Sequence, residues 1–352
     1  MISIQTIARL PKVDLHLHLD GSLRAETVLD LARQQGLALP VWTAAEVRGL
    51  LEVWGKAHDL AEYLTKFDLP VRLLQSPEAL TRVSRELIED VSRENVRYAE
   101  VRFAPWLHVR RGMRLSQAIR AVLDGLCQGE QRFGVRTRLI ACCMRSQSPQ
   151  DNLTLAEVAL RFKDVGLGGL DLAGDEALST PATLPVDAYR LAREHGLRRT
   201  VHAGEGAGPE SIRLAIHLLG AERLGHGVRL CEDPALQEEV RQRGIALEMC
   251  PKSNVQTRVV PSLRDHPIDA YLRAGLCVTV NTDNRRVSDT SLSQEYELMV
   301  REFGWGLPQI LATTRNSLAV AFIPEEERQA LVAQFEREWA ALSRPAANGE
   351  GS

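Results

Sequence analysis

The sequence lacks the features that mark membrane, secreted and nucleic-acid-binding proteins. None of its hydrophobic runs reaches the roughly 20 residues that a membrane-spanning helix needs. Its N-terminus has no basic start followed by an apolar stretch and a cleavage site, so no secretory signal is indicated. Its formal net charge is -3, and no extended basic surface is expected. We therefore expect a cytoplasmic protein whose partners include neither a membrane nor a nucleic acid.

Cysteine is also scarce. The 352 residues include six cysteines, which show neither a CxxC pair nor the spacing of a disulfide framework, so we expect them to be reduced and mostly buried. Hydrophobic residues make up 44% and charged residues 25% of the chain, as in globular proteins. No shift in composition marks a linker. We expect residues 1–345 to form one domain, followed by a disordered tail at 346–352.

What the sequence does contain is a regular alternation between short apolar segments and amphipathic helical ones. Eight segments have strand character, and a predicted helix follows each of them. Eight such units predict an α/β protein with a closed (β/α)8 barrel. A Rossmann fold is disfavoured because no GxGxxG motif joins a strand to a helix. The expected strands are 12–19, 96–103, 135–143, 167–173, 199–203, 223–226, 245–250 and 276–282, and extra C-terminal helices are expected at 291–303, 308–320 and 325–342.

The stretch 41–95 contains no convincing strand and is interpreted as a helical insertion after the first strand. Its expected helices lie at 44–54, 60–74 and 77–94. Tyr63, Leu64 and Phe67 give the second of these a mixed aromatic and aliphatic face. Such a face could pack within a helical hairpin, or it could form a lid over a binding site. The sequence pattern alone leaves both interpretations open.

Several predicted strands end in side chains that bind metals or transfer protons. His16 and His18 are two residues apart in the first strand, so both point to the same side of it. His202, His226 and Asp283 stand at the ends of the fifth, sixth and eighth strands. Parallel barrel strands bring these ends to one rim, where the active sites of such barrels lie. Singly, each residue is more often structural, but together they predict a metal site.

Three imidazoles and one carboxylate suit Zn²⁺, which takes nitrogen and oxygen ligands and in catalytic sites keeps a position for water. Zinc lowers the pKa of bound water from about 16 to roughly 7. We therefore expect one zinc ion per chain. Its expected ligands are His16, His18, His202 and Asp283.

Two further residues near these ligands are candidates for proton transfer. Glu205 follows His202 by three residues and can act as a general acid. His226, at the next strand end, can hold or deprotonate the water, or stabilise negative charge on an oxygen. The remaining histidines occupy no strand end, so we expect them at the surface or within helices. They are His58, His108, His195, His217 and His266.

Six short motifs occur in order along these segments. They are PKVDLHLHLDGS at 11–22, DLAGDE at 171–176, HAGE at 202–205, GHG at 225–227, CPKSN at 250–254 and VNTD at 280–283. In this set, from residue 12 to about 340, the chain resembles the adenosine deaminase family of metal-dependent amidohydrolase-type barrels. The resemblance implies zinc-dependent hydrolysis of adenosine and 2′-deoxyadenosine to inosine and 2′-deoxyinosine, with release of ammonia.

The resemblance also implies a role for each site residue. The zinc ligands would be the four residues named above. Glu205 would protonate purine N1 and make C6 electrophilic, while His226 and Asp283 would orient and deprotonate the attacking water. The helix expected at 60–74 would form the family's apolar gate, which favours the lid interpretation. The substrate itself would be contacted by His18, Asp20, Phe67, Gly174 and Asn284, with Asp20 on a ribose hydroxyl and the Gly174 backbone facing N3.

One position departs from the usual family pattern. The family commonly has two aspartates after the threonine, whereas this chain has Asp283 followed by Asn284. The second residue normally contacts purine N7, which is a hydrogen-bond acceptor. An Asn amide donates at any pH, whereas a carboxylate must be protonated to donate. Adenosine therefore stays compatible, and the alternative is another 6-aminopurine: aminodeoxyfutalosine or an N6-modified adenine nucleoside or nucleotide.

Other zinc hydrolases fit the sequence less well. A dinuclear amidohydrolase would need a bridging lysine at the fourth strand, which instead ends in Ala173, Gly174 and Asp175. The deaminases with an H-x-E and P-C-x-x-C signature need a cysteine pair that this chain lacks. A non-catalytic nucleoside-binding relative would lack a ligand or the acid, and this chain has all of them. The expected partner is a small purine nucleoside, and the pattern favours neither a monomer nor a homo-oligomer.

Overall fold

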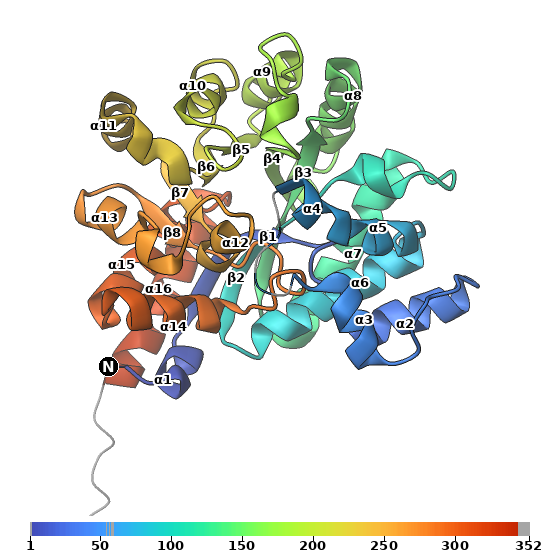
Figure 1. Ribbon diagram of the computed structural model, residues 1–352, viewed down its shortest axis with the longest axis horizontal. Helices are drawn as coiled ribbons and strands as arrows, with labels where there is room; N and C mark the ends of the chain where they lie inside the picture. Colours follow the sequence, from blue (N-terminus) through green and yellow to red (C-terminus); the bar gives the residue numbers. More distant parts are fainter. Residues whose placement is uncertain (1, 54, 56, 58–59, 344–352) are drawn as a thin grey trace, which may run out of the picture.

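The structure, a computed structural model, describes residues 2–53, 55, 57 and 60–343. Its eight strands are parallel and follow one another in chain order, each paired with the next. A bridge between Leu17 and Asp283 brings the end of the last strand beside the first. Helices surround these strands (Figure 1), so the predicted (β/α)8 barrel is confirmed. The expected tail at 346–352 lies outside the described residues.

The strands are β1 (Lys12–His18), β2 (Val96–Phe103), β3 (Arg136–Met144), β4 (Leu167–Ala173), β5 (Arg198–Ala203), β6 (Arg223–His226), β7 (Ala246–Met249) and β8 (Val278–Val280). The bounds of β2, β4 and β6 match the expected ones. β8 is shorter than expected because the residues after it close the barrel partly through side chains. Asn281 illustrates this, since its Oδ1 accepts a hydrogen bond from the Leu15 N–H at 2.9 Å.

The α-helices are α1 (Ile4–Arg9), α2 (Ala25–Gln34), α3 (Ala44–Leu51), α4 (Leu60–Leu64), α5 (Asp68–Leu73), α6 (Pro77–Ser92), α7 (Leu115–Phe133), α8 (Pro149–Leu160), α9 (Val186–Glu194), α10 (Pro209–His217), α11 (Pro234–Gln242), α12 (Pro251–Gln256), α13 (Ile268–Arg273), α14 (Leu292–Phe303), α15 (Leu307–Val320) and α16 (Glu325–Ser343). Short 3-10 helices are η1 (Thr65–Phe67), η2 (Pro105–His108), η3 (Lys163–Val165), η4 (Glu176–Leu178), η5 (Val228–Glu232) and η6 (Leu263–Asp265). The sequence pattern predicted neither α1 nor α12. Both have only six residues, too few for a clear helical periodicity.

The insertion after β1 is helical, as expected, but the helix expected at 60–74 is broken into α4, η1 and α5. Pro70 lies within α5 and explains the break. A proline has no N–H to donate, and its ring clashes with the carbonyl four residues earlier, which here belongs to Lys66 in η1. The backbone stays helical through η1, and α4 and α5 lie next to each other in Figure 1.

The barrel interior contains buried charge as well as apolar side chains. Arg102, Arg223 and Glu248 are all fully buried. Arg223 Nε donates to Glu248 Oε1 at 2.6 Å, and Arg102 donates to Glu248 Oε2 at 2.8 Å. Buried charges are costly unless they are paired and hydrogen-bonded, so these pairs hold one another in place. They lie beneath the strand ends that carry the candidate site.

All six cysteines are free thiols. Cys142, Cys143 and Cys250 are buried, but Cys127 and Cys231 are exposed and Cys277 is half-buried, so the expectation that most would be buried was wrong. Cys127 is exposed because it lies on the solvent side of α7. None of the helices that the structure describes is both long and apolar enough to cross a bilayer.

Candidate metal centre and active site

The closure of the barrel places Asp283 beside the two histidines of β1. Asp283 donates its backbone N–H to the His16 carbonyl, and His18 donates its N–H to the Asp283 carbonyl, both at 2.8 Å. Asp283 and His226 have φ angles of 58° and 67°. This left-handed region is uncommon for residues other than glycine, and such strain is often stored at functional sites. This backbone conformation directs the side chains of Asp283 and His226 toward the same point.

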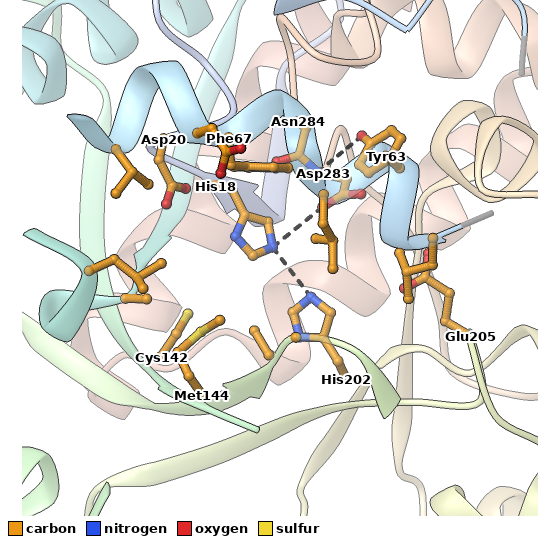
Figure 2. A pocket seen from close by; sticks show the side chains of 18 of the residues that line it. His18, Asp20, Tyr63, Phe67, Cys142, Met144, His202, Glu205, Asp283 and Asn284 are labelled. Atoms are coloured by element: carbon orange, nitrogen blue, oxygen red, sulfur yellow. Dashed lines mark hydrogen bonds and ion pairs between the residues drawn. The ribbon is translucent and has the colours of Figure 1, made fainter. Parts of the chain in front are cut away.

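Five ligand-type side chains meet at this point. His16 Nε2 and His18 Nε2 each lie 3.4 Å from Asp283 Oδ1, and His18 Nε2 lies 3.3 Å from His202 Nε2. Figure 2 shows His18 between Asp283 and His202. His16, His202, His226 and Asp283 also offer ligand atoms that all lie within 4.8 Å of one another.

The donor chemistry of this cluster fits a metal ion. His16 Nε2 is buried and has no hydrogen-bond partner, which is unusual for a buried polar atom. The Ser253 hydroxyl donates to Asp283 Oδ2 at 2.6 Å, leaving Oδ1 to face the histidines. Nitrogen and oxygen donors gathered in this way suit zinc or another transition metal.

Buried carboxylates orient two of the histidines. His16 Nδ1 lies 2.9 Å from Glu248 Oε2, and His202 Nδ1 lies 2.9 Å from Asp171 Oδ2. Arg102 donates to both carboxylates. Burial favours the neutral acids, but the partners of each group outweigh it and hold the pKa of Asp171 and of Glu248 well below the usual range. Each imidazole therefore donates from Nδ1 and presents the Nε2 lone pair to the centre, as metal ligands do.

Glu205 lies beside the metal cluster and is only 7% exposed. Its Oε2 is 3.4 Å from His226 Nε2, and the Thr257 hydroxyl donates to its Oε1 at 3.3 Å. Burial, followed by the charges of Asp283 and Glu176, raises the pKa of Glu205 well above its usual range. This shift favours the protonated carboxyl group, which is the form that a general acid needs.

The loop that carries Glu205 is held by another carboxylate. Glu176, at the start of η4, accepts hydrogen bonds from four consecutive backbone N–H groups at 2.9 to 3.2 Å. Glu176 is 4% exposed, so these bonds are its main compensation for burial. It thereby joins the loop after β4 to the loop after β5. The four donors belong to Gly204, Glu205, Gly206 and Ala207.

A cavity of about 230 Å³ opens above the cluster. All five residues expected to contact substrate line it, namely His18, Asp20, Phe67, Gly174 and Asn284. Glu205, His226 and Asp283 line it too, whereas His16 is fully buried below. Cys142 and Met144, whose side chains contain sulfur, line the cavity across from Asn284 (Figure 2).

The insertion contributes both to the core and to this cavity. Leu60, Leu64 and Phe67 line the cavity, while Tyr63 is 2% exposed. The Tyr63 hydroxyl is 2.8 Å from Ser288 Oγ and accepts a hydrogen bond from Asn284 Nδ2 at 3.2 Å. The two interpretations of this face are therefore not exclusive: α4 packs against the loop after β8 and also walls the cavity.

Two of the histidines expected at the surface or within helices are buried. His108 lies within η2, as expected, but His266 lies between η6 and α13, so the expectation was wrong for His266. His108 is 0% exposed; its Nε2 lies 3.7 Å from Asp20 Oδ2, and its ring stacks on Phe103. His266 is 3% exposed and contacts Asn254. Packing from distant segments buries both, and no local pattern signals it. His195 and His217 are exposed as expected, and His58 lies outside the described residues.

His108 affects Asp20, a predicted substrate contact. Burial favours the neutral acid, but the nearby imidazoles of His108 and His18 outweigh it and lower the pKa of Asp20. Asp20 is therefore an ionised acceptor suited to a hydroxyl group. The sequence analysis assigned no role to several residues that hold the site together. Four of them lie within the motifs at 171–176 and 250–254, but their partners are far away in the sequence; the other three lie in segments with no motif. The residues are Asp171, Glu176, Ser253 and Asn254, and Arg102, Glu248 and Thr257.

The sequence model of the family described as adenosine deaminase matches residues 11–337 of this chain. The adenosine deaminase of Clostridium kluyveri is 38% identical over 93% of this chain and 93% of its own. Among solved structures, the adenine deaminase of Arthrobacter aurescens superimposes with a TM-score of 0.86 at 30% identity, covering 94% of this chain and 99% of its own. An amidohydrolase from Burkholderia ambifaria with bound Zn has a TM-score of 0.86 at 27% identity, covering 97% and 95%.

Proposed function

This chain belongs to the adenosine deaminase family and catalyses the hydrolytic deamination of adenosine, and from this premise we propose which residues carry out each part of the reaction. The observation that carries the proposal is the meeting, in one cavity, of a metal-ligand cluster and a buried Glu205 whose pKa is raised. Hydrolysis at C6 needs an activated water and an acid for the ring nitrogen, and these are the two groups supplied.

The metal of this centre is zinc, one ion per chain, held by four residues. Supporting observations are the unpartnered Nε2 of His16, the mixed nitrogen and oxygen donor set, and the zinc bound in the B. ambifaria amidohydrolase. When bound, such an ion polarises a water and lowers its pKa. The ligands are His16, His18, His202 and Asp283.

The protein's own side chains perform the proton transfers. Glu205 donates its proton to purine N1, which draws electron density from C6 and makes it open to attack. Asp283 takes a proton from the attacking water, and His226 stabilises the new oxygen on C6. The C6–N6 bond of the tetrahedral intermediate then breaks, and the amino group leaves as ammonia with the proton that Asp283 took up. The C6 hydroxyl returns a proton to Glu205 as it becomes the 6-oxo group, so adenosine and water give inosine and ammonia.

The walls of the cavity select a nucleoside. Asp20 accepts a hydrogen bond from a ribose hydroxyl, and its negative charge disfavours a 5′-phosphate nearby. The backbone of Gly174 faces purine N3, and Asn284 faces N7. The aromatic ring of Phe67 and the imidazole of His18 complete the wall. We include 2′-deoxyadenosine among the substrates.

The proposal extends to the protein as a whole. Residues 1–345 act as one domain, which the single eight-stranded sheet supports. The enzyme works in the cytoplasm, which the six free thiols support.

An ultraviolet assay with zinc-quantified protein tests the proposal. It compares adenosine, 2′-deoxyadenosine, adenine and AMP, each with and without a chelator. We expect chelator-sensitive turnover of the two nucleosides and little turnover of adenine or AMP. Turnover that survives complete metal removal would overturn the metal-dependent mechanism, and selective turnover of AMP or adenine would overturn the role given to Asp20.

A further inference from the structure

A row of three buried side chains leads from the start of α13 into the active site. His266 is 3% exposed, Asn254 is 0% exposed and His226 is 1% exposed. Asn254 lies between the two histidines, 3.1 Å from each. His266 and Asn254 do not line the cavity, so they act on the reaction only through His226.

Backbone groups fix the direction of every hydrogen bond in this row. The Ile268 N–H donates to His266 Nδ1 at 3.2 Å. His266 Nδ1 is therefore an acceptor, and in a neutral imidazole the other nitrogen, Nε2, then carries the hydrogen. That Nε2–H donates to Asn254 Oδ1.

A second backbone group fixes the orientation of the Asn254 amide independently. The Cys250 N–H donates to Asn254 Oδ1 at 3.3 Å. If the amide were turned over, its NH₂ group would face two donors, the Cys250 N–H and His266 Nε2–H. The oxygen of Asn254 therefore faces Cys250 and His266, and its NH₂ group faces His226.

These hydrogen bonds determine which ring nitrogen of His226 carries hydrogen. Asn254 Nδ2 donates to His226 Nδ1, so Nδ1 is an acceptor and the hydrogen of the neutral ring is on Nε2. Nε2 is the nitrogen that faces the cavity, 3.4 Å from Glu205 Oε2. His226 thus presents a hydrogen-bond donor to the reacting atoms.

The two histidines bound to carboxylates have the opposite polarity. Glu248 and Asp171 each also accept from Arg102, so as carboxylate acceptors they make the Nδ1 atoms of His16 and His202 donors and leave Nε2 free to ligate a metal. The rings of His16, His202 and His226 lie in one cluster, yet the group that each ring contacts at Nδ1 gives them different tautomers. An imidazole whose Nδ1 faces a carboxylate can ligate a metal through Nε2. The imidazole whose Nδ1 faces the Asn254 amide carries its hydrogen on Nε2 and donates it.

We propose that His266 and Asn254 are positioning residues that hold His226 in its Nε2–H tautomer, so that His226 donates to the oxygen at C6 and neither ligates the metal nor accepts the water proton. The inference rests on the function proposed above. It leaves proton abstraction from the water to Asp283 alone. It also narrows the earlier expectation that His226 could either hold or deprotonate the water.

Nitrogen-15 NMR of the zinc-loaded full-length enzyme with labelled histidine rings tests the tautomer directly. A ring nitrogen that carries hydrogen and one that has a free lone pair resonate far apart, and the His226 signals are assigned as those missing from a His226→Gln spectrum. We expect hydrogen on Nε2 and a lone pair on Nδ1. Hydrogen on Nδ1, or a His226 nitrogen bound to zinc, would overturn the proposal.

Asn254→Asp reverses the direction of the last hydrogen bond, because a carboxylate accepts from Nδ1–H and leaves a lone pair on Nε2. We expect kcat to fall about 10²- to 10⁴-fold, as when a catalytic donor or tautomer is lost, with KM within a few-fold and one zinc per chain. His266→Phe removes one of the two donors that orient the Asn254 amide but leaves the Cys250 N–H, so it should lower kcat less. The matched control His217→Phe changes an exposed histidine and should leave kcat unchanged.

The outcomes separate this inference from the function on which it rests. No adenosine turnover by the zinc-loaded wild-type enzyme would count against the proposed function. Normal turnover with His226 in the Nδ1–H tautomer would count against the inference alone, as would an Asn254→Asp enzyme with a reversed tautomer and an unchanged kcat. If Asn254→Asp does not fold, the wild-type spectrum still decides.

Discussion

At the scale of single residues, the chemistry of this enzyme depends on which buried groups are left with a proton. Glu205 is surrounded by other acids, Asp283 and Glu176, and burial adds to their effect, so its pKa is raised. Asp283 shows the opposite behaviour. Burial opposes ionisation there too, but the imidazoles of His16 and His18 that face Asp283 lower its pKa. The two carboxylates in one cavity therefore suit the two roles, acid and base, that we propose for them.

Glu205→Gln should remove the acid without disturbing the metal. We expect kcat to fall by about 10²- to 10⁴-fold, with zinc content unchanged by metal analysis. In the wild-type enzyme, kcat/KM should fall as pH rises through the raised pKa of Glu205, because the ionised form cannot donate. Full activity in the variant would remove Glu205 from this role.

The same substitution has a consequence for stability. The pKa of Glu205 is higher in the folded than in the unfolded protein, so its contribution is fully present below the unfolded value of about 4.3 and is lost as pH rises through the folded value. Glu205→Gln does not titrate. The melting temperature of the variant, relative to wild type, should therefore rise with pH above about pH 4.3, as measured by thermal melts across the pH range. A constant difference would contradict the raised pKa.

Asn284→Asp tests the position that departs from the family pattern. Asn284 Nδ2 donates to the Tyr63 hydroxyl, and the amide has a second hydrogen for purine N7. An aspartate must be protonated to donate to N7, so KM for adenosine should rise with pH in the variant more than in the wild type. Zinc content should not change. Loss of zinc would show that Asn284 supports the metal centre instead.

At the scale of elements, the site is assembled where loops after different strands hold one another. The loop after β4 supplies Glu176, and the loop after β5 supplies the four backbone N–H groups that donate hydrogen bonds to this carboxylate. The helices of the insertion approach from another side, where Tyr63 in α4 is bonded to the segment after β8. Each catalytic side chain therefore depends on an element far away in the sequence.

Glu176→Gln should loosen the Glu205 loop. An amide has one acceptor oxygen and an NH₂ group, so it cannot accept at all four positions. The loss of hydrogen bonds to a charged group should cost about 2 kcal/mol of unfolding free energy, measured by denaturant titration. The alkaline limb of the kcat/KM profile should also move to lower pH, because the negative charge of Glu176 raises the pKa of Glu205.

A matched control for Glu176 lies next to it. Asp175 caps η4 by accepting from the Ala177 N–H at 2.9 Å, and an Asn caps a helix about as well as an Asp does. Asp175→Asn should therefore change neither the unfolding free energy nor the pH profile appreciably. If both variants moved the alkaline limb equally, a general change in local charge would explain the effect better than the loop contact.

At the scale of the whole molecule, the metal centre joins opposite parts of the barrel. Its proposed ligands come from β1, from β5 and from the residue that bridges the end of β8 to β1. Beneath it, Arg102 of β2 pairs with carboxylates of β4 and β7. The ion would therefore stabilise barrel closure as well as take part in the reaction.

Removal of the metal should lower both activity and stability. A ligand present at 100 times its Kd stabilises the folded state by about 2.7 kcal/mol, so chelation should lower the melting temperature by several degrees and abolish turnover. Adding zinc should restore both. The variant His16→Ala, which lacks one ligand, should show little response to either treatment, and an unchanged melting temperature in chelated wild-type protein would argue against a structural role for the ion.

The sequence by itself determined the barrel and the chemical types of the site residues. Strand and helix periodicities are local, and the ends of parallel strands must share a rim, so His16, His202 and Asp283 could be expected to meet. Only the tertiary structure decided which partner each of them has. The contacts of His16 with Glu248, and of His226 with Asn254 and His266, join distant segments, and whether a group is ionised or which nitrogen carries hydrogen depends on burial and on those partners. No local pattern encodes these quantities, because they arise only when the chain is packed.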